Sequence, residues 1–579
     1  MIKGHEIDPS KVITNPEDKI DIRDNDRMGK NKQFIKSYYI KSKATDDGMD
    51  KVLLITKDEY ENKYLDIIEE PHLQFYVTKP EYWEGQNVNY IEKEKVDRMS
   101  CIFKDRYWAI PEMLGDMELT NEVHRLLGSG YYEDFKTARD LVDMDGRLHG
   151  SDINIEDQYI NLLLQKYPDD DNNNDYIRKG FYDIEVDGTE IDGFPEPEEA
   201  EAPINMITYV DSYTHDVYVY ILKYESETYK EALSKKDEII EEIYQENIEI
   251  GFEFNIDIIE CETEIELIGR FLENVNQKTT PDFLLAWNAD FDFATIFNRI
   301  KKLGQDPAEF FSPKEFPYKD AWYRLDTGAT DPANKSSSFM TTSYTNWLDQ
   351  LALYASINKG AKTLESYTLE SVAQEELGAG KADYDGEIID LFQRDYTKFL
   401  QYGIQDSILL YRIENKIQHV ELLYYMSIMT ATRPTHVLKK TISLRNLGNI
   451  FYYDNGYIIS NNRAKQFPRQ AGKIAGGYVG DPNLVDNVGV DLSTGMSQFL
   501  HDDVTDVDLK SLYPSITEAY NISPETHMGK IDYINQEGED ETIHFMDGYT
   551  SDDPINFGIE FLGLPNVEEL ASILEDGDS

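Results

Sequence analysis

Apolar residues recur along the middle of the chain at two spacings, and the spacing changes from one segment to the next. Apolar runs of about four to eight residues bounded by polar turns are typical of strands, whereas apolar residues at three- and four-residue steps form one face of a helix. Their alternation predicts an α/β domain over about 178–418. The expected elements are strands at 181–186, 204–210 and 281–287, and helices at 292–303 and 395–417.

The segments on either side of this domain have other patterns. Residues 1–177 mix short β-like runs, such as 51–56, with polar loops, and we expect an N-terminal α+β domain there. The run 168–175 consists almost entirely of Asp and Asn, so it is a natural boundary between domains. Residues 419–478 are mainly helical in pattern, and a β-rich segment leads into 479–579.

Length and composition indicate a folded intracellular protein of about four domains. The 40 tyrosines and a hydrophobic content of 40% argue against disorder. Cys101 and Cys261 are too few for a four-cysteine zinc site or a disulfide framework, which favours a reducing cytosol. The sequence has no signal pattern at Met1 and no apolar run of about 18 residues, so we expect a cytoplasmic protein without a membrane partner.

The net charge of -55, from 56 basic and 111 acidic residues, lowers the expectation of nucleic-acid binding. An acidic surface repels phosphates, which basic patches usually contact. A solvated acidic surface, a salty habitat or a basic partner would each account for the charge. Because an average hides local patches, specific motifs take precedence over it.

Asp183 and Glu185 stand two residues apart in the expected strand 181–186, so both side chains lie on one face. Two carboxylates there form a hard-oxygen site of the kind that Mg²⁺ or Mn²⁺ prefers. Taken alone, the pair is also typical of a solvated strand edge.

Two further clusters make a metal site the better interpretation. Asp292 follows the apolar strand 281–287 at the expected start of a helix, where an ordinary N-cap is the alternative. Tyr402 and Asp406 are four residues apart, so they share one helix face, where a plain surface pair is the alternative. Four carboxylates converging at one sheet end would suit two metal ions that cleave a phosphodiester.

In this order, and with 366–374 and 384–386 between the second and third clusters, these motifs resemble the 3′→5′ proofreading domain of family B DNA polymerases, particularly those of tailed phages. The resemblance implies a ribonuclease H-like domain that uses two Mg²⁺ or Mn²⁺ ions. It also implies a helical segment 419–478 that returns to the N-terminal domain. The positions that match the family's metal ligands are Asp183, Glu185, Asp292 and Asp406.

The same resemblance suggests supporting roles for three more residues. Tyr402 matches the tyrosine that positions the attacking water, and Asn288 fits the asparagine of the second motif. Lys381 matches an assisting lysine. Asp290 is an extra carboxylate beside Asp292, but the family motif places its ligand directly after an aromatic residue, which favours Asp292.

Residues 508–516, Asp-Leu-Lys-Ser-Leu-Tyr-Pro-Ser-Ile, resemble the first palm motif of the same polymerases. The resemblance implies that Asp508 binds both catalytic metals, together with the backbone of Leu509. It also implies that Ser511 and Leu512 hold the triphosphate. Tyr513 would lie beneath the deoxyribose and leave no room for a 2′-hydroxyl. Residues 479–579 would then be a partial palm.

The sequence lacks the finger-helix pattern and the Tyr-x-Asp-Thr-Asp palm hairpin of that family. We therefore expect one subunit of a split replicative polymerase, whose second chain supplies fingers, the rest of the palm and the thumb. Expected ligands are primer–template DNA, a single-stranded 3′ end and dNTP, with a sliding clamp reached through the second chain. The alternatives are a free-standing exonuclease with an inert palm remnant, a non-catalytic acidic scaffold or inhibitor in replication, and a truncated gene.

Overall fold

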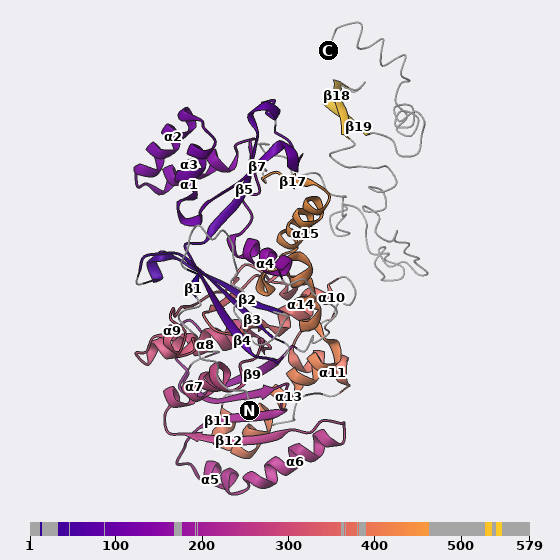
Figure 1. Ribbon diagram of the computed structural model, residues 1–579. Helices are drawn as coiled ribbons and strands as arrows, with labels where there is room; N and C mark the ends of the chain where they lie inside the picture. Colours follow the sequence, from indigo (N-terminus) through magenta and orange to yellow (C-terminus); the bar gives the residue numbers. More distant parts are fainter. Residues whose placement is uncertain are drawn as a thin grey trace, which may run out of the picture. The chain divides into compact units, whose positions relative to one another are not determined.

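The computed structural model describes residues 12–13, 33–461 with short gaps, 527–534 and 540–546 (Figure 1). It forms two compact units, Met1–Arg469 and Gln470–Ser579. In the second unit the described part is one antiparallel pair, β18 (His527–Ile534) and β19 (Asp540–Met546). The gaps fall at 46, 59, 86, 167–176, 192, 194, 360–363, 365, 379 and 381–389.

The predicted palm residues and one auxiliary residue of the exonuclease lie outside the described residues. They are Asp508, Leu509, Ser511, Leu512, Tyr513 and Lys381. The predicted boundary at 168–175 also falls in a gap, so the division of the first unit at 177/178 and 418/419 stays a proposal.

The N-terminal part of the first unit is built on two small sheets with the strand orders β1-β4-β3-β2 and β7-β5-β8. Helices α1 to α4 share one apolar core with β2, β3 and β5. The strands are β1 (Val12–Ile13), β2 (Gln33–Ile40), β3 (Lys51–Lys57), β4 (Lys63–Glu69), β5 (His72–Thr78), β7 (Val96–Ile102) and β8 (Leu148–His149). The helices are α1 (Arg106–Met113), α2 (Met117–Gly128), α3 (Tyr132–Asp143) and α4 (Ile155–Lys166).

A six-stranded mixed sheet forms the centre of the unit, in the order β12-β11-β10-β9-β13-β16. Strands β9, β10 and β11 are antiparallel neighbours, whereas β13 runs parallel to both β9 and β16. The mixed α/β architecture expected from the sequence is therefore confirmed. The strands are β9 (Lys179–Val186), β10 (Ile204–Asp211), β11 (Asp216–Leu222), β12 (Asn255–Cys261), β13 (Phe283–Ala286) and β16 (Asn346–Asp349).

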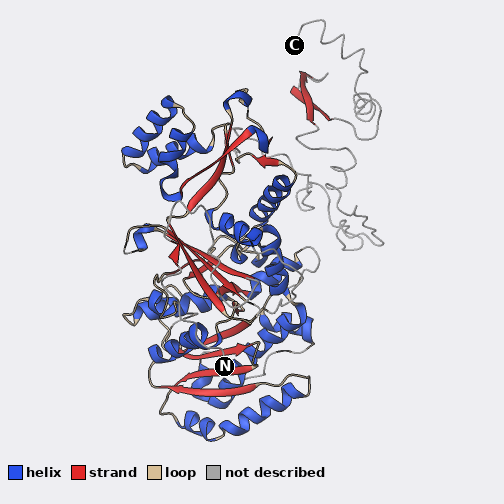
Figure 2. Cartoon of the chain, in the orientation of Figure 1, coloured by secondary structure: helices blue, strands red, loops and turns tan. Residues whose placement is uncertain are grey.

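Helices cover both faces of this sheet (Figure 2). One face packs against α7 (Glu264–Glu273), α8 (Ala289–Lys302) and α9 (Pro307–Phe311). The other packs against a larger group: α5 (Glu227–Ser234), α6 (Lys236–Ile248), α10 (Gln350–Asn358), α11 (Leu369–Leu377), α12 (Leu391–Arg394), α13 (Tyr396–Ile417) and α14 (His419–Thr430). No described helix has both the length and the apolar character needed to cross a bilayer.

The remaining elements flank the sheet or lead back from it. A hairpin pairs β14 (Ala321–Arg324) with β15 (Ser338–Thr341). After α14 the chain forms α15 (Lys440–Asp454), and β17 (Tyr457–Ile459) then pairs with β6 (Tyr90–Glu92). The segment that follows the central sheet thus returns to the N-terminal part.

The expected strands and helices match the structure closely, with one difference that matters for the site. Helix α8 begins at Ala289, and Asn288 occupies its N-cap position. Asp292 therefore lies inside the first turn, so its alternative interpretation as an N-cap is wrong. The apolar strand ends at Ala286, which leaves room for an earlier helix start than the apolar spacing predicted.

A buried ionic network at Asp282 joins the N-terminal sheet to the central sheet. Its carboxylate lies 2.9 Å from Lys57 Nζ and 2.8 Å from Lys63 Nζ, and it accepts the amide of Arg178 at 3.0 Å. The Asp282 carbonyl also accepts the amide of Asn346 at 2.9 Å. Burial alone would raise the pKa of Asp282, but Lys57 and Lys63 outweigh it and hold the pKa at about 2.

Replacing Asp282 with Asn should lower the free energy of unfolding by about 3–5 kcal/mol, because buried Lys63 loses its counter-charge and buried Lys57 keeps only Glu61. Thermal or urea unfolding followed by tryptophan fluorescence measures this. The exposed carboxylate of Asp237 offers a matched control, and Asp237→Asn should have little effect. Equal midpoints for the two variants would contradict a structural role for the network.

The same network predicts a pH dependence. The folded-state pKa of Asp282, about 2, lies below the value of about 3.9 for an unfolded Asp. The ionised carboxylate therefore stabilises the fold fully above about pH 4, and this contribution is lost as pH falls towards 2. The wild type should lose stability over that interval by more than Asp282→Asn does.

Candidate active site

Three parallel strands bring their carboxyl ends to one edge of the central sheet. In the register, Leu285 of β13 pairs with Phe181 of β9, and Ala286 pairs with Asp349 of β16. Asp183 stands two residues beyond Phe181. The end of β9 and the end of β16 thus each place an aspartate at this edge, on either side of the turn from β13 into α8.

Asp292, in the first turn of α8, completes a group of three carboxylates. It is 5% exposed, and burial raises its pKa well above the ordinary value, with the charges of Asp183 and Asp349 adding to the rise. The pKa of the buried Tyr182 hydroxyl is raised by burial and then by the same three aspartates. The charges of Asp183 and Asp349 thus act on both Asp292 and Tyr182, which indicates that the three carboxylates lie near one another.

Asp349 is a site residue that the sequence analysis missed. Its side chain accepts the amide of Ala352 at 3.0 Å, while its Oδ2 is buried without a hydrogen-bond partner among the described residues. Burial raises its pKa to about 7; Lys335 lowers it and Asp290 raises it. The available signal was an aspartate that ends an apolar strand and begins a helix, the arrangement that singled out Asp292.

Helix α13 brings the third predicted cluster over β9. Gly403 lies against β10, where its carbonyl accepts the hydroxyl of Thr208 at 3.1 Å and an added Cβ would meet Met206 Cε. Thr208 and Met206 are the cross-strand partners of Asp183 and Glu185. Tyr402 and Asp406, on either side of this contact, are both buried, at 7% and 3% exposed. Close packing at Gly403 thus holds this part of α13 against the strand pair that carries Asp183 and Glu185.

The other predicted residues near α8 occupy more open positions. Asn288 is exposed, and its backbone carbonyl accepts the amides of Phe291 and Asp292. Asp290 forms an ion pair with Lys335 at 3.0 Å. Asp290 is thus paired with the Lys335 side chain, whereas Asp292 lies among other carboxylates.

The donor set suits divalent cations. Carboxylate oxygens are the ligands that Mg²⁺ and Mn²⁺ prefer, and buried like charges with raised pKa values are what such an ion would stabilise. Among the described residues, no group of three or more His, Cys, Asp or Glu side chains has an arrangement that could hold a metal ion. The metal-binding roles of Asp183, Glu185, Asp292 and Asp406 therefore stay predictions, to which Asp349 is added.

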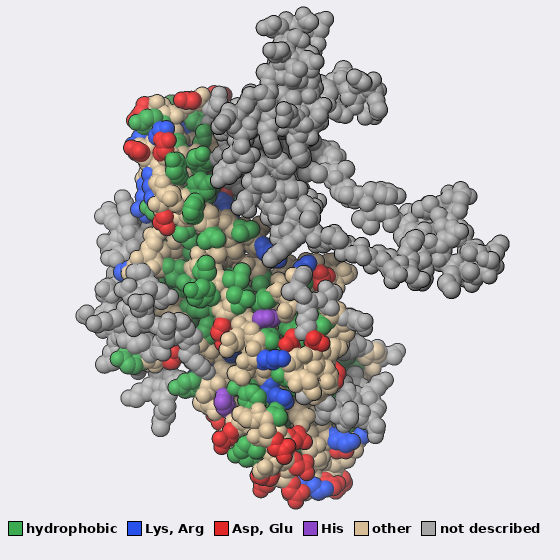
Figure 3. All heavy atoms as spheres, turned by 90° about the vertical axis from the view of Figure 1, so that its right-hand side faces the viewer, with side chains coloured by type: hydrophobic (Ala, Val, Ile, Leu, Met, Phe, Trp, Pro, Cys, Tyr) green, Lys and Arg blue, Asp and Glu red, His purple; other side chains and the backbone are tan. Residues whose placement is uncertain are grey.

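A cavity of about 370 Å³ opens beside this site. Asp349 and Lys335 line it together with residues of β15, α10 and the start of α15. Acidic side chains gather at the lower end of the face in Figure 3, at the level of α5 and α6 in Figure 1, and Lys and Arg side chains also lie near its middle. The acidity of the chain is therefore unevenly distributed.

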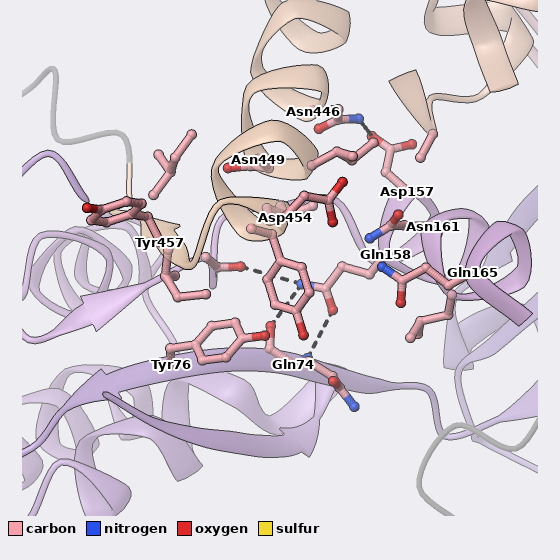
Figure 4. Close-up of a pocket in the computed structure, with 18 of the residues that line it drawn as sticks. Gln74, Tyr76, Asp157, Gln158, Asn161, Gln165, Asn446, Asn449, Asp454 and Tyr457 are labelled. Carbon is pink, nitrogen blue, oxygen red and sulfur yellow. Dashed lines mark hydrogen bonds between the residues drawn. The ribbon is translucent and has the colours of Figure 1, made fainter. Parts of the chain in front are cut away.

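A second cavity, of about 130 Å³, lies between β5, α4 and α15 (Figure 4). Amide side chains dominate its hydrogen bonds: Gln158 accepts the amide of Gln74 at 2.9 Å and donates to the Gln74 carbonyl at 2.9 Å. Asn446 donates to Asp157 at 3.0 Å. This second cavity shares no lining residue with the cavity beside the carboxylates. The bond from Asn446 to Asp157 joins α15 to the N-terminal part.

Comparison with known proteins shows what the part of the chain that holds Asp183, Asp292 and Asp349 is similar to. Residues 124–372 match the family model described as DNA polymerase family B, exonuclease domain. The match includes Asp183, Glu185, Asp292 and Asp349 and ends before Tyr402 and Asp406. The six-stranded sheet with helices on both faces is accordingly the ribonuclease H-like exonuclease fold that the resemblance implied.

The chain is also similar to part of several DNA polymerases. It is 28% identical over 377 residues to the DNA-directed DNA polymerase of Escherichia phage RB69, covering 63% of this chain and 38% of that protein. It is 28% identical to the DNA-directed DNA polymerase of Enterobacteria phage T4, covering 61% and 36%, and 26% identical to the DNA polymerase of Thermococcus sp. (strain 9oN-7), covering 48% and 31%. The chain thus spans less than two fifths of the length of these relatives.

Packing at Gly403 is testable by a double-mutant cycle. Gly403→Ala should destabilise the protein by about 1–3 kcal/mol, because the added methyl group forces α13 away from Met206. Met206→Ala alone leaves a cavity, but together with Gly403→Ala it makes room for the methyl group. The two changes should therefore cost less together than the sum of the single costs, by about 0.5–3 kcal/mol in urea unfolding. Simple additivity would contradict this packing.

Proposed function

We propose that this chain, which carries the exonuclease domain of DNA polymerase family B, removes nucleotides from the 3′ end of single-stranded DNA with two Mg²⁺ or Mn²⁺ ions. The observation that supports this most is the convergence of Asp183, Asp292 and Asp349 within the matched domain. Buried carboxylates that repel one another destabilise a fold until a cation neutralises them. Such clusters are therefore typical of sites that bind cations or catalyse reactions.

Each predicted residue has a role in this proposal. When bound, two divalent cations would activate the attacking water and stabilise the leaving oxygen of the phosphodiester. Asp183, Glu185, Asp292 and Asp406 would hold them, and Asp349 would orient or supplement that set. Tyr402 would hold the water, with Asn288 and Lys381 as auxiliary residues. A mispaired 3′ end frays more readily, so it would reach such a site more often than a paired one.

For polymerisation we propose that the chain contributes Asp508 and the sugar-selecting Tyr513 to a composite site. Fingers, the rest of the palm and the thumb would come from a second chain. Primer–template DNA, dNTP and a clamp reached through that chain would be the partners. The DNA polymerases of phages among the relatives support a role in phage-type replication in the host cytoplasm.

Replacing both Asp183 and Glu185 with Ala should reduce exonuclease activity by several orders of magnitude, because cation binding and charge stabilisation are lost together. The measurement follows shortening of a 5′-labelled single-stranded oligonucleotide with Mg²⁺. Asp257→Ala with Glu249→Ala removes the same charge from exposed positions and should retain activity. Continued degradation of the oligonucleotide by the Asp183/Glu185 variant would contradict the assignment of these two residues to the exonuclease site.

Polymerisation is tested by complementation. A purified chain that carries fingers, thumb and a Tyr-x-Asp-Thr-Asp motif should support primer extension when mixed with this chain. Asp508→Ala should eliminate extension and leave the exonuclease intact, because the two sites use different carboxylates. Extension that survives Asp508→Ala would refute the composite site, and an active exonuclease without extension would favour a free-standing nuclease.

A further inference from the structure

The cavity beside the carboxylate site has a charge opposite to that of the whole chain. Across the sequence, acidic residues outnumber basic ones by 111 to 56. Among the described residues that line this cavity there are four lysines and one carboxylate. Serine and threonine hydroxyls supply further hydrogen-bonding groups from β15, α10 and α15. The lysines are Lys335, Lys359, Lys439 and Lys440, and the carboxylate is Asp349.

Two of these lysines, Lys439 and Lys440, have no salt bridge within the part of the chain that the structure describes. They stand at the N-cap and first positions of the fifteen-residue helix α15. The positive end of a helix dipole disfavours lysine there and favours an anion. Arg324 and Arg433 add to the positive potential, since burial and then these two charges lower the pKa of Lys439. A lysine pair in this unfavourable position is readily explained if it binds an anion.

A second observation connects the cavity to the reacting end of a substrate. Asp349 lines the cavity and is 9% exposed. Its Oδ2 is buried and has no hydrogen-bond partner among the described residues. Lys335 also lines it and forms the ion pair with Asp290 in the first turn of α8. The cavity is therefore lined both by Asp349, one of the converging carboxylates, and by the lysine pair at the start of α15.

We infer that this cavity binds the sugar–phosphate backbone of a single DNA strand whose 3′ end lies at the carboxylates, with Lys439 and Lys440 contacting its phosphates. This rests on the proposed exonuclease function and adds to it the part of the molecule that retains the strand. Contacts to phosphates carry no base preference, so the strand is held regardless of sequence. The volume of about 370 Å³ exceeds what ordered water alone requires.

The experiment measures binding without catalysis. A fluorescein-labelled oligo(dT) is titrated with the full chain in EDTA at several KCl concentrations, and fluorescence anisotropy gives Kd. Lys439→Gln with Lys440→Gln should weaken binding about tenfold or more near 0.1 M salt and reduce the salt slope by about 1.4, because each single-strand phosphate contact contributes about 0.7. Thermal unfolding should be unchanged or slightly higher, since positive charge is removed from a helix N-terminus.

Two controls separate this effect from net charge and from misfolding. Lys230→Gln with Lys235→Gln removes the same charge from α5 and its C-cap, and should leave the salt slope unchanged. Lys439→Glu should raise the unfolding temperature of the protein, because an acidic residue is favoured at the start of α15, and it should still weaken DNA binding. An unchanged slope in the Lys439/Lys440 variant, or an equal change in the α5 control, would overturn the inference. Binding of dTMP that falls as much as binding of oligo(dT) would overturn it too, because the cavity would then hold a mononucleotide.

Failure of this inference is distinguishable from failure of the proposed function. If the wild type degrades single strands but the lysine variant binds them as tightly, the lysine cavity alone is wrong. If the Asp183/Glu185 variant still degrades DNA while the lysine variant loses binding, the carboxylate assignment is wrong and the strand-binding cavity stands.

Discussion

Everything at the candidate active site depends on how the amino ends of three parallel strands are held, and Asp282 holds them. Its backbone amide donates to the Arg178 carbonyl at 2.7 Å, its carbonyl accepts from Asn346, and its carboxylate accepts from Arg178. One residue thus connects the starts of β9, β13 and β16. Because strands are stiff over a few residues, fixing their starts also fixes which residues meet at their ends.

Placing three carboxylates close together is electrostatically unfavourable, and other parts of the fold supply the stability that offsets it. Asp183, Asp292 and Asp349 are held close enough that burial and like charge raise the pKa of Asp292, which is unfavourable in an otherwise apolar setting. Apolar clusters on both faces of the sheet and the ionic network at its opposite end offset that cost. Strain from repelling carboxylates is typical of a site prepared for a cation and a phosphodiester.

The net charge of -55 argues against DNA as a ligand only while it is treated as an average. Acidic side chains are concentrated on helices such as α6, where Glu242 and Glu246 pair with glutamines of α13. The cavity beside the carboxylates has the reverse balance. Since charges beyond a Debye length of about 8 Å are screened at physiological salt, a strand in that cavity responds to the nearby lysines more than to distant glutamates.

The central elements and most of the candidate carboxylates are predictable from the order of residues alone. Strand and helix periodicity, and the short spacings within Asp183–Glu185 and Tyr402–Asp406, are relations between near neighbours, which a sequence displays directly. The predicted start of α8 was three residues late, because apolar spacing does not mark the first turn of a helix.

Contacts between residues far apart in the chain become visible only in the folded molecule. Asp349 joins Asp183 through the register of β16 with β13, and no local pattern encodes that pairing. Gly403 matters because Met206 of β10 lies against it, and the lysines of α15 matter because the chain returns past the site after α14. Such contacts join segments far apart in the chain, so they follow from packing, burial and charge in the folded molecule and not from the order of residues alone.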